Sequence, residues 1–159
     1  MKITVTWNAP IPLPGEARDL CDSFDFDVLP DDAGVYLFGR RFGPKLSVLY
    51  VGKAGVLRTR IRQQLNNNRL MRALDDAPSG ERVLIYGTFS GKRGARIAQW
   101  LNTVEEALIT HFTEEEHDLI NKVGTRLEFD EIDFEGSRIA TGATGRALRV
   151  PKRRRGLLG

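Results

Sequence analysis

The chain has 159 residues, of which 41% are hydrophobic and 28% charged, as is typical of a soluble globular protein with one domain. Its single cysteine excludes an internal disulfide, and no apolar run is long enough to cross a membrane. The net charge is only +3, which leaves the class of partner open. Residues 1–7 alternate polar and apolar side chains, unlike the apolar block of a signal peptide, so we expect a reduced, cytoplasmic protein.

The charges are unevenly distributed along the chain. Residues 53–72 include six basic side chains and no acidic one, and residues 138–155 are also basic without an acid. Acidic residues gather in segments 19–32, 105–118 and 128–135. This segregation favours one positive face, which would suit a polyanionic partner. Solvated surface charge explains the same distribution equally well.

The first 29 residues are predicted to form an extension that packs on the core. Residues 1–7 alternate as a strand does, and three prolines then mark a loop. Residues 16–26 are compatible with a short helix. A turn at residues 29–32 leads into the main domain, which we place at residues 30–135.

Two β-favouring runs, residues 35–38 and 46–51, are separated by a spacer that contains two glycines and a proline. This pattern predicts an antiparallel hairpin. The hairpin would bring Tyr36 and Tyr50 near each other on adjacent strands.

Helical and strand patterns alternate after the hairpin. They predict helices at residues 56–66 and 69–75, a strand at 82–89, a basic glycine-rich break at 90–94, and a long helix at 96–112. Residues 119–123 could form a short strand and residues 126–134 a further element. We expect residues 136–159 to be a flexible basic tail because glycines and a basic run dominate them. The predicted fold is a small α/β (α+β) domain of order β-β-α-β-α, with a three-stranded antiparallel or mixed sheet flanked by helices.

The long helix carries a carboxylate in an unusual position. At about 100° per residue, Glu105 falls at the edge of the apolar stripe, whereas Glu106 points to the opposite side. A carboxylate at the edge of a buried face is costly to dehydrate unless a cation compensates it. Since Mg²⁺ binds one or two carboxylates together with waters and phosphate oxygens, Glu105 is a candidate ligand for Mg²⁺ or Mn²⁺. A boundary glutamate paired with an arginine would show the same pattern.

Several motifs occur in a defined order along residues 30–121. They are Gly34-Val35-Tyr36, Tyr50-Val51-Gly52, the helix arginine Arg60, Glu105 followed by Leu108-Ile109, and Asn121. This set resembles the GIY-YIG nuclease family, and locally the N-terminal nuclease module of the bacterial nucleotide-excision-repair endonuclease. The resemblance implies a metal-dependent endonuclease that hydrolyses phosphodiester bonds in DNA, with RNA as an alternative substrate.

The resemblance also implies catalytic roles for five residues. Tyr36 would deprotonate or orient the attacking water, with Lys53 helping to lower the pKa of its hydroxyl, and Tyr50 would orient water or phosphate. Arg60 and an ion on Glu105 would stabilise the charge that develops at phosphorus. Taken alone, each tyrosine is also a typical packing residue, and an arginine on a basic helix a typical surface residue.

Further residues are expected to support this site. Gly34, Gly52 and Asn121 would be structural or orienting, and Gly52 would permit a close approach of the backbone. Contacts with the nucleic-acid backbone are predicted for the basic residues Arg58, Arg62, Lys92, Arg93 and Arg96.

Two features depart from the family pattern. Many members have a histidine four residues after the helix arginine, where this chain has Gln64. There is also no recognisable target-recognition domain, so substrate choice would need a recognition partner protein or a homodimer. Two other readings stay open: a nucleic-acid-binding module that has kept the fold and lost turnover, and an interaction module that uses the basic tail.

Overall fold

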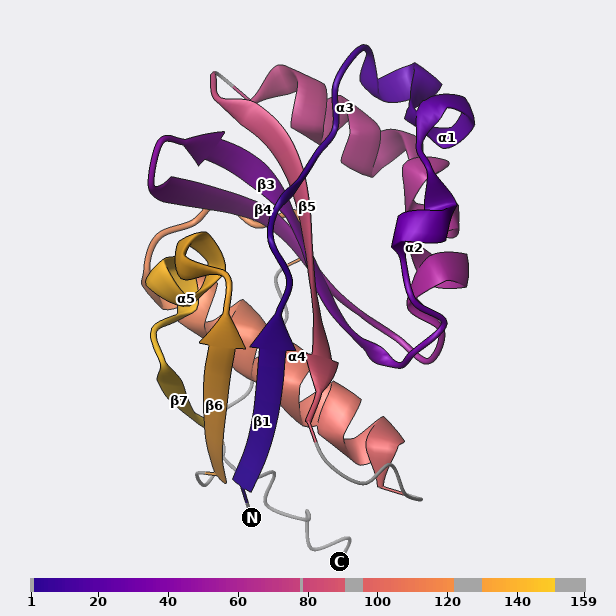
Figure 1. Ribbon diagram of the computed structural model, residues 1–159. Helices are drawn as coiled ribbons and strands as arrows, with labels where there is room; N and C mark the ends of the chain where they lie inside the picture. The colour runs from indigo at the N-terminus through magenta and orange to yellow at the C-terminus, as the bar shows by residue number, and fades with distance from the viewer. Residues whose placement is uncertain (1, 78, 91–95, 122–129, 151–159) are drawn as a thin grey trace, which may run out of the picture.

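The structure is a computed structural model that describes residues 2–77, 79–90, 96–121 and 130–150. Its centre is a mixed sheet with the order β4-β3-β5-β1-β6-β7, in which β2 pairs with β5 (Figure 1). Strands β1 and β6 are parallel, and the other pairs are antiparallel. The strands are β1 (Lys2–Trp7), β2 (Ile11–Pro12), β3 (Gly34–Phe42), β4 (Lys45–Ala54), β5 (Glu81–Phe89), β6 (Asp130–Gly136) and β7 (Ala147–Val150).

The mixed α/β class is confirmed, but the predicted three-stranded sheet is too small. The expected hairpin and third strand form the β4-β3-β5 part, and the described residues extend it to seven strands. β1 pairs antiparallel with β5 and parallel with β6, so it lies inside the sheet rather than on a separate extension. Pairing between the two ends of a chain depends on long-range contacts that local alternation does not reveal.

The helices cover both faces of the sheet (Figure 1). The 3₁₀ turns at Ala17–Asp19 and Phe26–Val28 flank the short helix α1, so the single helix predicted at 16–26 is broken into three pieces. In the residues that the structure covers, no helix combines the length and apolar character needed to cross a membrane. The helices are α1 (Leu20–Ser23), α2 (Leu57–Leu65), α3 (Asn68–Asp76), α4 (Ile97–Glu114) and α5 (Arg138–Thr144).

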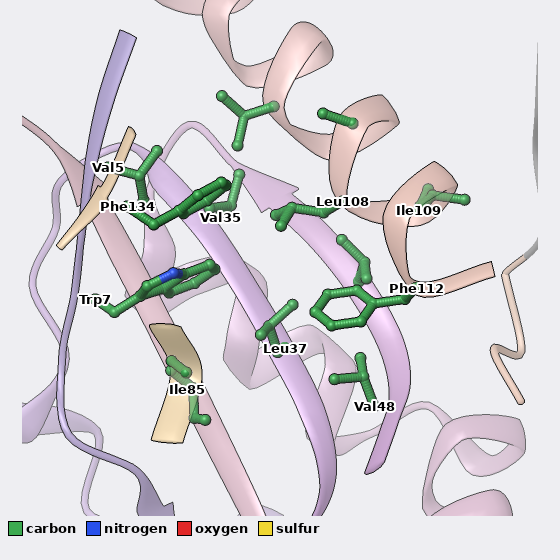
Figure 2. Close-up of a cluster of buried hydrophobic side chains, with 14 of the residues drawn as sticks. Val5, Trp7, Val35, Leu37, Val48, Ile85, Leu108, Ile109, Phe112 and Phe134 are labelled. Atoms are coloured by element: carbon green, nitrogen blue, oxygen red, sulfur yellow. The ribbon is translucent and has the colours of Figure 1, made fainter. Parts of the chain in front are cut away.

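Strand alternation divides the core between these two faces. Val35 and Leu37 of β3 pack with α4, whereas Tyr36 and Phe38 point to the side of α2 and α3. Figure 2 shows the α4 side, where Phe112 meets Leu37 and residues of the neighbouring strands. β3 therefore places Tyr36 on the α2 side of the sheet, and its alternate residues pack against α4 on the other side.

The prediction of a flexible tail from residue 136 is wrong for residues 138–150. These form α5 and β7, and β7 pairs with β6. Ala140 is fully buried, while Ile139 and Leu148 pack against the core. This burial stabilises segments too short and too rich in glycine to show a periodic pattern. Residues 151–155 of the basic run lie outside the described residues.

The other helices and β5 agree with their predicted bounds within about two residues, as is usual for helix and strand ends. The hairpin strands are longer than predicted: β3 continues to Phe42 rather than to residue 38, and β4 continues to Ala54 rather than to residue 51. Residues 119–123 also differ from the prediction: the described part, 119–121, is not a strand, although it runs along the free edge of β4. Ile120 N–H donates to the Leu49 carbonyl at 2.8 Å, and Val48 N–H donates to Nδ1 of His117 at 2.9 Å. The edge of β4 is thus covered without a regular strand.

Candidate active site

The predicted catalytic residues meet at the edge strand β4. A cleft of about 570 Å³ lies there, between α2 on one face of the sheet and α4 on the other. Residues from β3, β4, α2 and α4 line it together with Asn121. The lining includes all five predicted catalytic residues, namely Tyr36, Tyr50, Lys53, Arg60 and Glu105.

The cleft has two walls, because successive residues of β4 point to opposite faces of the sheet. Tyr50 points toward α2 and Lys53 toward α4, three positions further along the strand. We call Tyr36, Tyr50, Arg60 and Gln64 the tyrosine wall. We call Lys53, Asn102 and Glu105 the glutamate wall.

One buried amide connects the two tyrosines. Gln64 is 4% exposed, and its Nε2 donates to Oη of Tyr36 at 2.8 Å and to Oη of Tyr50 at 3.1 Å. The tyrosine rings are stacked, with centroids 6.2 Å apart and planes at 18°. The proximity predicted from the hairpin is confirmed, and Gln64 occupies the position where many members of the resembled family have histidine.

Burial dominates the ionisation of Tyr36. It raises the pKa of this hydroxyl to about 12, although the hydrogen bond from Gln64 and the positive charge of Arg60 act to lower it. We expected neighbouring cations to bring the pKa toward neutrality, and the shift has the opposite direction. The reason is that Tyr36 is fully buried and Lys53 lies on the other wall.

The glutamate wall is an ion pair with a third partner. Lys53 Nζ lies 3.3 Å from Oε1 of Glu105 and donates to Oδ1 of Asn102 at 2.6 Å. The Lys53 side chain is 40% exposed and that of Glu105 is 21% exposed. The boundary position predicted for Glu105 is confirmed, and the cation that compensates it is a lysine rather than an arginine.

Arg60 is exposed at the mouth of the cleft. Its Nη1 donates to Oε1 of Gln63 at 3.2 Å, and its charge acts on the hydroxyl of Tyr36. An exposed guanidinium beside a buried hydroxyl can bind two oxygens of a phosphate group through its forked donors.

The residues predicted to hold the nucleic-acid backbone are placed differently. Arg58 donates to the Leu29 carbonyl through Nε at 3.0 Å and Nη2 at 2.8 Å, so it binds the N-terminal segment of its own chain. The guanidinium of Arg62 lies 4.4 Å from the centroid of the Phe26 ring, a cation–π contact. Arg96 is exposed before α4 and does not line the cleft, and Lys92 and Arg93 lie outside the described residues.

The two glycines have close neighbours. A Cβ added to Gly52 would overlap the Tyr36 ring, and one added to Gly34 would overlap the Gly87 carbonyl on β5. Gly52 therefore makes room for the tyrosine, and Gly34 lets β3 and β5 approach.

Asn121 holds the outer edge of β4. Its Oδ1 accepts from Val51 N–H at 3.2 Å and its Nδ2 donates to the Val51 carbonyl. This side chain imitates the pairing of a neighbouring strand next to Tyr50, which agrees with the structural or orienting role that we predicted.

Two residues of the site were not predicted as participants: Gln64 and Asn102. Asn102 precedes Glu105 by three positions, so the helical period places both on one face of α4. Gln64 follows Arg60 by one helical turn. Both spacings can be found in the sequence. The role of a neutral amide nevertheless cannot be predicted until its hydrogen-bond partners are known.

Comparison with known proteins adds no relative, since no protein-family model, curated protein or solved structure matches this chain.

Proposed function

We propose that this protein is a metal-dependent endonuclease that hydrolyses phosphodiester bonds in DNA. The observation that carries the proposal is the convergence of Tyr36, Tyr50, Lys53, Arg60 and Glu105, from four separate elements, on one cleft at the edge of β4. All of them except Lys53 belong to the ordered motifs of the sequence.

The glutamate wall fits a divalent ion by its donor set. Two oxygens, from Glu105 and Asn102, converge on the ammonium of Lys53, which shows that this point favours positive charge. Within the described residues, no three histidine, cysteine or acidic side chains are placed to hold a metal ion together. The proposed Mg²⁺ or Mn²⁺ would therefore take one carboxylate together with waters and phosphate oxygens. When bound, such an ion would lower the pKa of a coordinated water and neutralise charge on the phosphate.

The tyrosine wall would position the phosphodiester. Arg60 would stabilise the negative charge that develops on the phosphate oxygens. Because burial raises the pKa of Tyr36 to about 12, its hydroxyl keeps its proton near neutral pH. Of the two roles predicted for Tyr36, deprotonating or orienting the attacking water, we propose orientation, and we extend it to the phosphate.

The test is cleavage of supercoiled plasmid and of a panel of branched DNA and RNA oligonucleotides with Mg²⁺, Mn²⁺ or EDTA. We expect metal-dependent nicking that Glu105→Ala lowers at least 100-fold, the order expected when one stabilising group at the reacting centre is removed. Glu114→Ala is the matched control, because Glu114 is an exposed acid at the end of the same helix and does not line the cleft. Cutting retained by Glu105→Ala would contradict the metal assignment.

The ion pair between Lys53 and Glu105 favours a second candidate function. It neutralises the proposed metal ligand, as expected in a module that binds nucleic acid and has lost turnover. This alternative predicts that wild type and Glu105→Ala bind DNA alike and that neither cuts any substrate in the panel.

A further inference from the structure

The direction of each hydrogen bond behind the tyrosine wall can be followed from a backbone donor. Leu70 N–H can only donate, and it does so to Oδ1 of Asn67 at 3.3 Å. Asn67 therefore turns its amide nitrogen toward Gln64, and its Nδ2 donates to Oε1 of Gln64 at 3.1 Å. Each amide has one oxygen and one nitrogen end, so fixing one end fixes the other.

The Gln64 amide must consequently present its nitrogen to the tyrosines. An NH₂ group has two hydrogens, and the two tyrosine hydroxyls lie 2.8 and 3.1 Å from Nε2. One hydrogen serves each hydroxyl oxygen. Both tyrosines are thereby acceptors toward the protein interior.

A phenol that accepts a hydrogen bond still has its own O–H to donate. Within the described part of the chain, no acceptor for the O–H of Tyr36 or Tyr50 lies within hydrogen-bonding distance. Both residues line the cleft, where the Tyr50 side chain is partly exposed and that of Tyr36 is fully buried, so Tyr50 is the first of the two hydroxyls that a ligand meets. The guanidinium of Arg60 and the ammonium of Lys53 line the same cleft. The single acid among the lining residues, Glu105, is paired with Lys53. The cleft thus offers donors and positive charge.

We propose that Tyr36 and Tyr50 form a paired donor site for a tetrahedral oxyanion, namely a phosphate group, and that Gln64 is the positioning residue that orients both hydroxyls. The choice of phosphate rests on the proposed function, whereas the donor polarity rests on the hydrogen-bond chain alone. The raised pKa of Tyr36 agrees with this role, since a donor must keep its proton.

The polarity can be reversed by a nearly isosteric substitution. In Gln64→Glu a carboxylate that only accepts replaces the NH₂ group, so both tyrosine hydroxyls would turn their protons inward. Gln64→Met has a similar volume and leaves the hydroxyls without a partner. Gln99→Glu is the matched control, because it makes the same change at an exposed position of α4 outside the cleft lining.

The experiment is a titration of the full chain with inorganic phosphate in EDTA. Calorimetry measures the affinity, and NMR monitors the side-chain amide of Gln64. We expect saturable binding that changes the chemical shift of this amide. Gln64→Glu should weaken the affinity at least tenfold, Gln64→Met and the single changes Tyr36→Phe and Tyr50→Phe severalfold, and Gln99→Glu less than twofold. Circular dichroism verifies that each variant is folded, and the two tyrosine variants carry the test if Gln64→Glu does not fold.

Phosphate binding that is unchanged in Tyr36→Phe and Tyr50→Phe would overturn the donor site. Unchanged binding in folded Gln64→Glu and Gln64→Met would overturn the positioning role. The proposed function fails separately: if the wild type binds phosphate through the tyrosines but cuts nothing with Mg²⁺ or Mn²⁺, the donor site stands and the nuclease does not.

Discussion

The tyrosine wall and the glutamate wall face the same cleft, yet their polar groups are held in place in different ways. On the first, a buried neutral amide serves Tyr36 and Tyr50, and its own orientation is traced back to a backbone N–H. On the second, Lys53 and Glu105 form a partly exposed ion pair. One wall is held by buried hydrogen bonds, and the other contains a cation that the proposed metal ion would replace.

This difference gives the two walls different properties: hydrogen bonds fix the positions of groups on the tyrosine wall, and opposite charges hold the glutamate wall together. Buried hydrogen bonds are costly to leave unmade, so the tyrosine wall should resist rearrangement. An ion pair with this degree of exposure contributes at most about 1 kcal/mol to stability. Displacement of the Lys53 ammonium from Glu105 by a divalent ion would therefore cost little free energy. The two walls should therefore respond differently to substitution, pH and metal.

The largest expected effect is at Arg60, which would bind the phosphate in the proposed nuclease. Arg60→Ala should lower the cleavage rate by about 100- to 1000-fold, because the forked donors for the transition state are lost. Arg60→Lys retains the charge without the fork and should recover only part of the rate. The measurement is single-turnover cleavage at saturating protein. Arg18→Ala is the control, since Arg18 is exposed and pairs with Glu16, and equal losses in both variants would argue against a specific role.

The next effect tests whether the Tyr36 hydroxyl is excluded from solvent. Tyrosine in an unfolded chain ionises near pH 10, whereas Tyr36 in the folded protein ionises at about 12. Its contribution to stability is fully present below pH 10 and is lost as the pH rises from 10 to 12, since only the unfolded state then releases this proton. Two pKa units correspond to about 3 kcal/mol.

Urea unfolding at a series of pH values between 9 and 12 measures this linkage. The free energy of unfolding of the wild type should fall more steeply above pH 10 than that of Tyr36→Phe, which has no proton to lose. Tyr86, whose pKa burial also raises, is common to both proteins and cancels in the comparison. Parallel curves would mean that Tyr36 is solvated.

A smaller effect is expected at Gly52, which supports the same wall from β4. Gly52→Ala would place a Cβ within the Tyr36 ring and should destabilise the fold by about 1–3 kcal/mol while displacing the hydroxyl. Gly55→Ala is the control in the adjacent turn, because nothing lies within 4 Å of the added Cβ. Thermal unfolding of both variants, repeated in a Tyr36→Ala background, gives the coupling between positions 36 and 52. Additive effects would show that the ring is not the obstacle.

The local parts of this arrangement could be predicted from the sequence. The hairpin, α4 and the edge position of Glu105 follow from periods of two and about 3.6 residues. Alternation along β4 would also have placed Lys53 opposite Tyr50, because an odd spacing changes the face of a strand. We expected Lys53 to act on Tyr36, and the structure pairs it with Glu105 instead.

The remaining parts depend on contacts between distant segments. The pairing of β1 with β6 and the burial of α5 involve the two ends of the chain. The function of Gln64 depends on Tyr36, which lies 28 positions away, and on the orientation set by Asn67. An amide gains a direction only from its partners, so no pattern of residue types could reveal that the tyrosines are turned into donors.

The smallest expected effect distinguishes the glutamate wall from the tyrosine wall most directly. Lys53→Met removes the cation that now neutralises Glu105, so Mn²⁺ should bind up to about fivefold more tightly, in line with the value of a partly exposed ion pair. Titration with Mn²⁺ followed by electron paramagnetic resonance, without nucleic acid, measures this affinity. Lys45→Met, at the exposed far end of β4, is the matched control and should leave Mn²⁺ binding unchanged.

Phosphate binding in EDTA should fall in Lys53→Met, because one positive charge leaves the cleft. Tighter Mn²⁺ binding together with weaker phosphate binding in Lys53→Met would show that the Lys53 ammonium occupies the position of the metal ion. Weaker Mn²⁺ binding in this variant would show that the ammonium and the metal ion do not compete for Glu105.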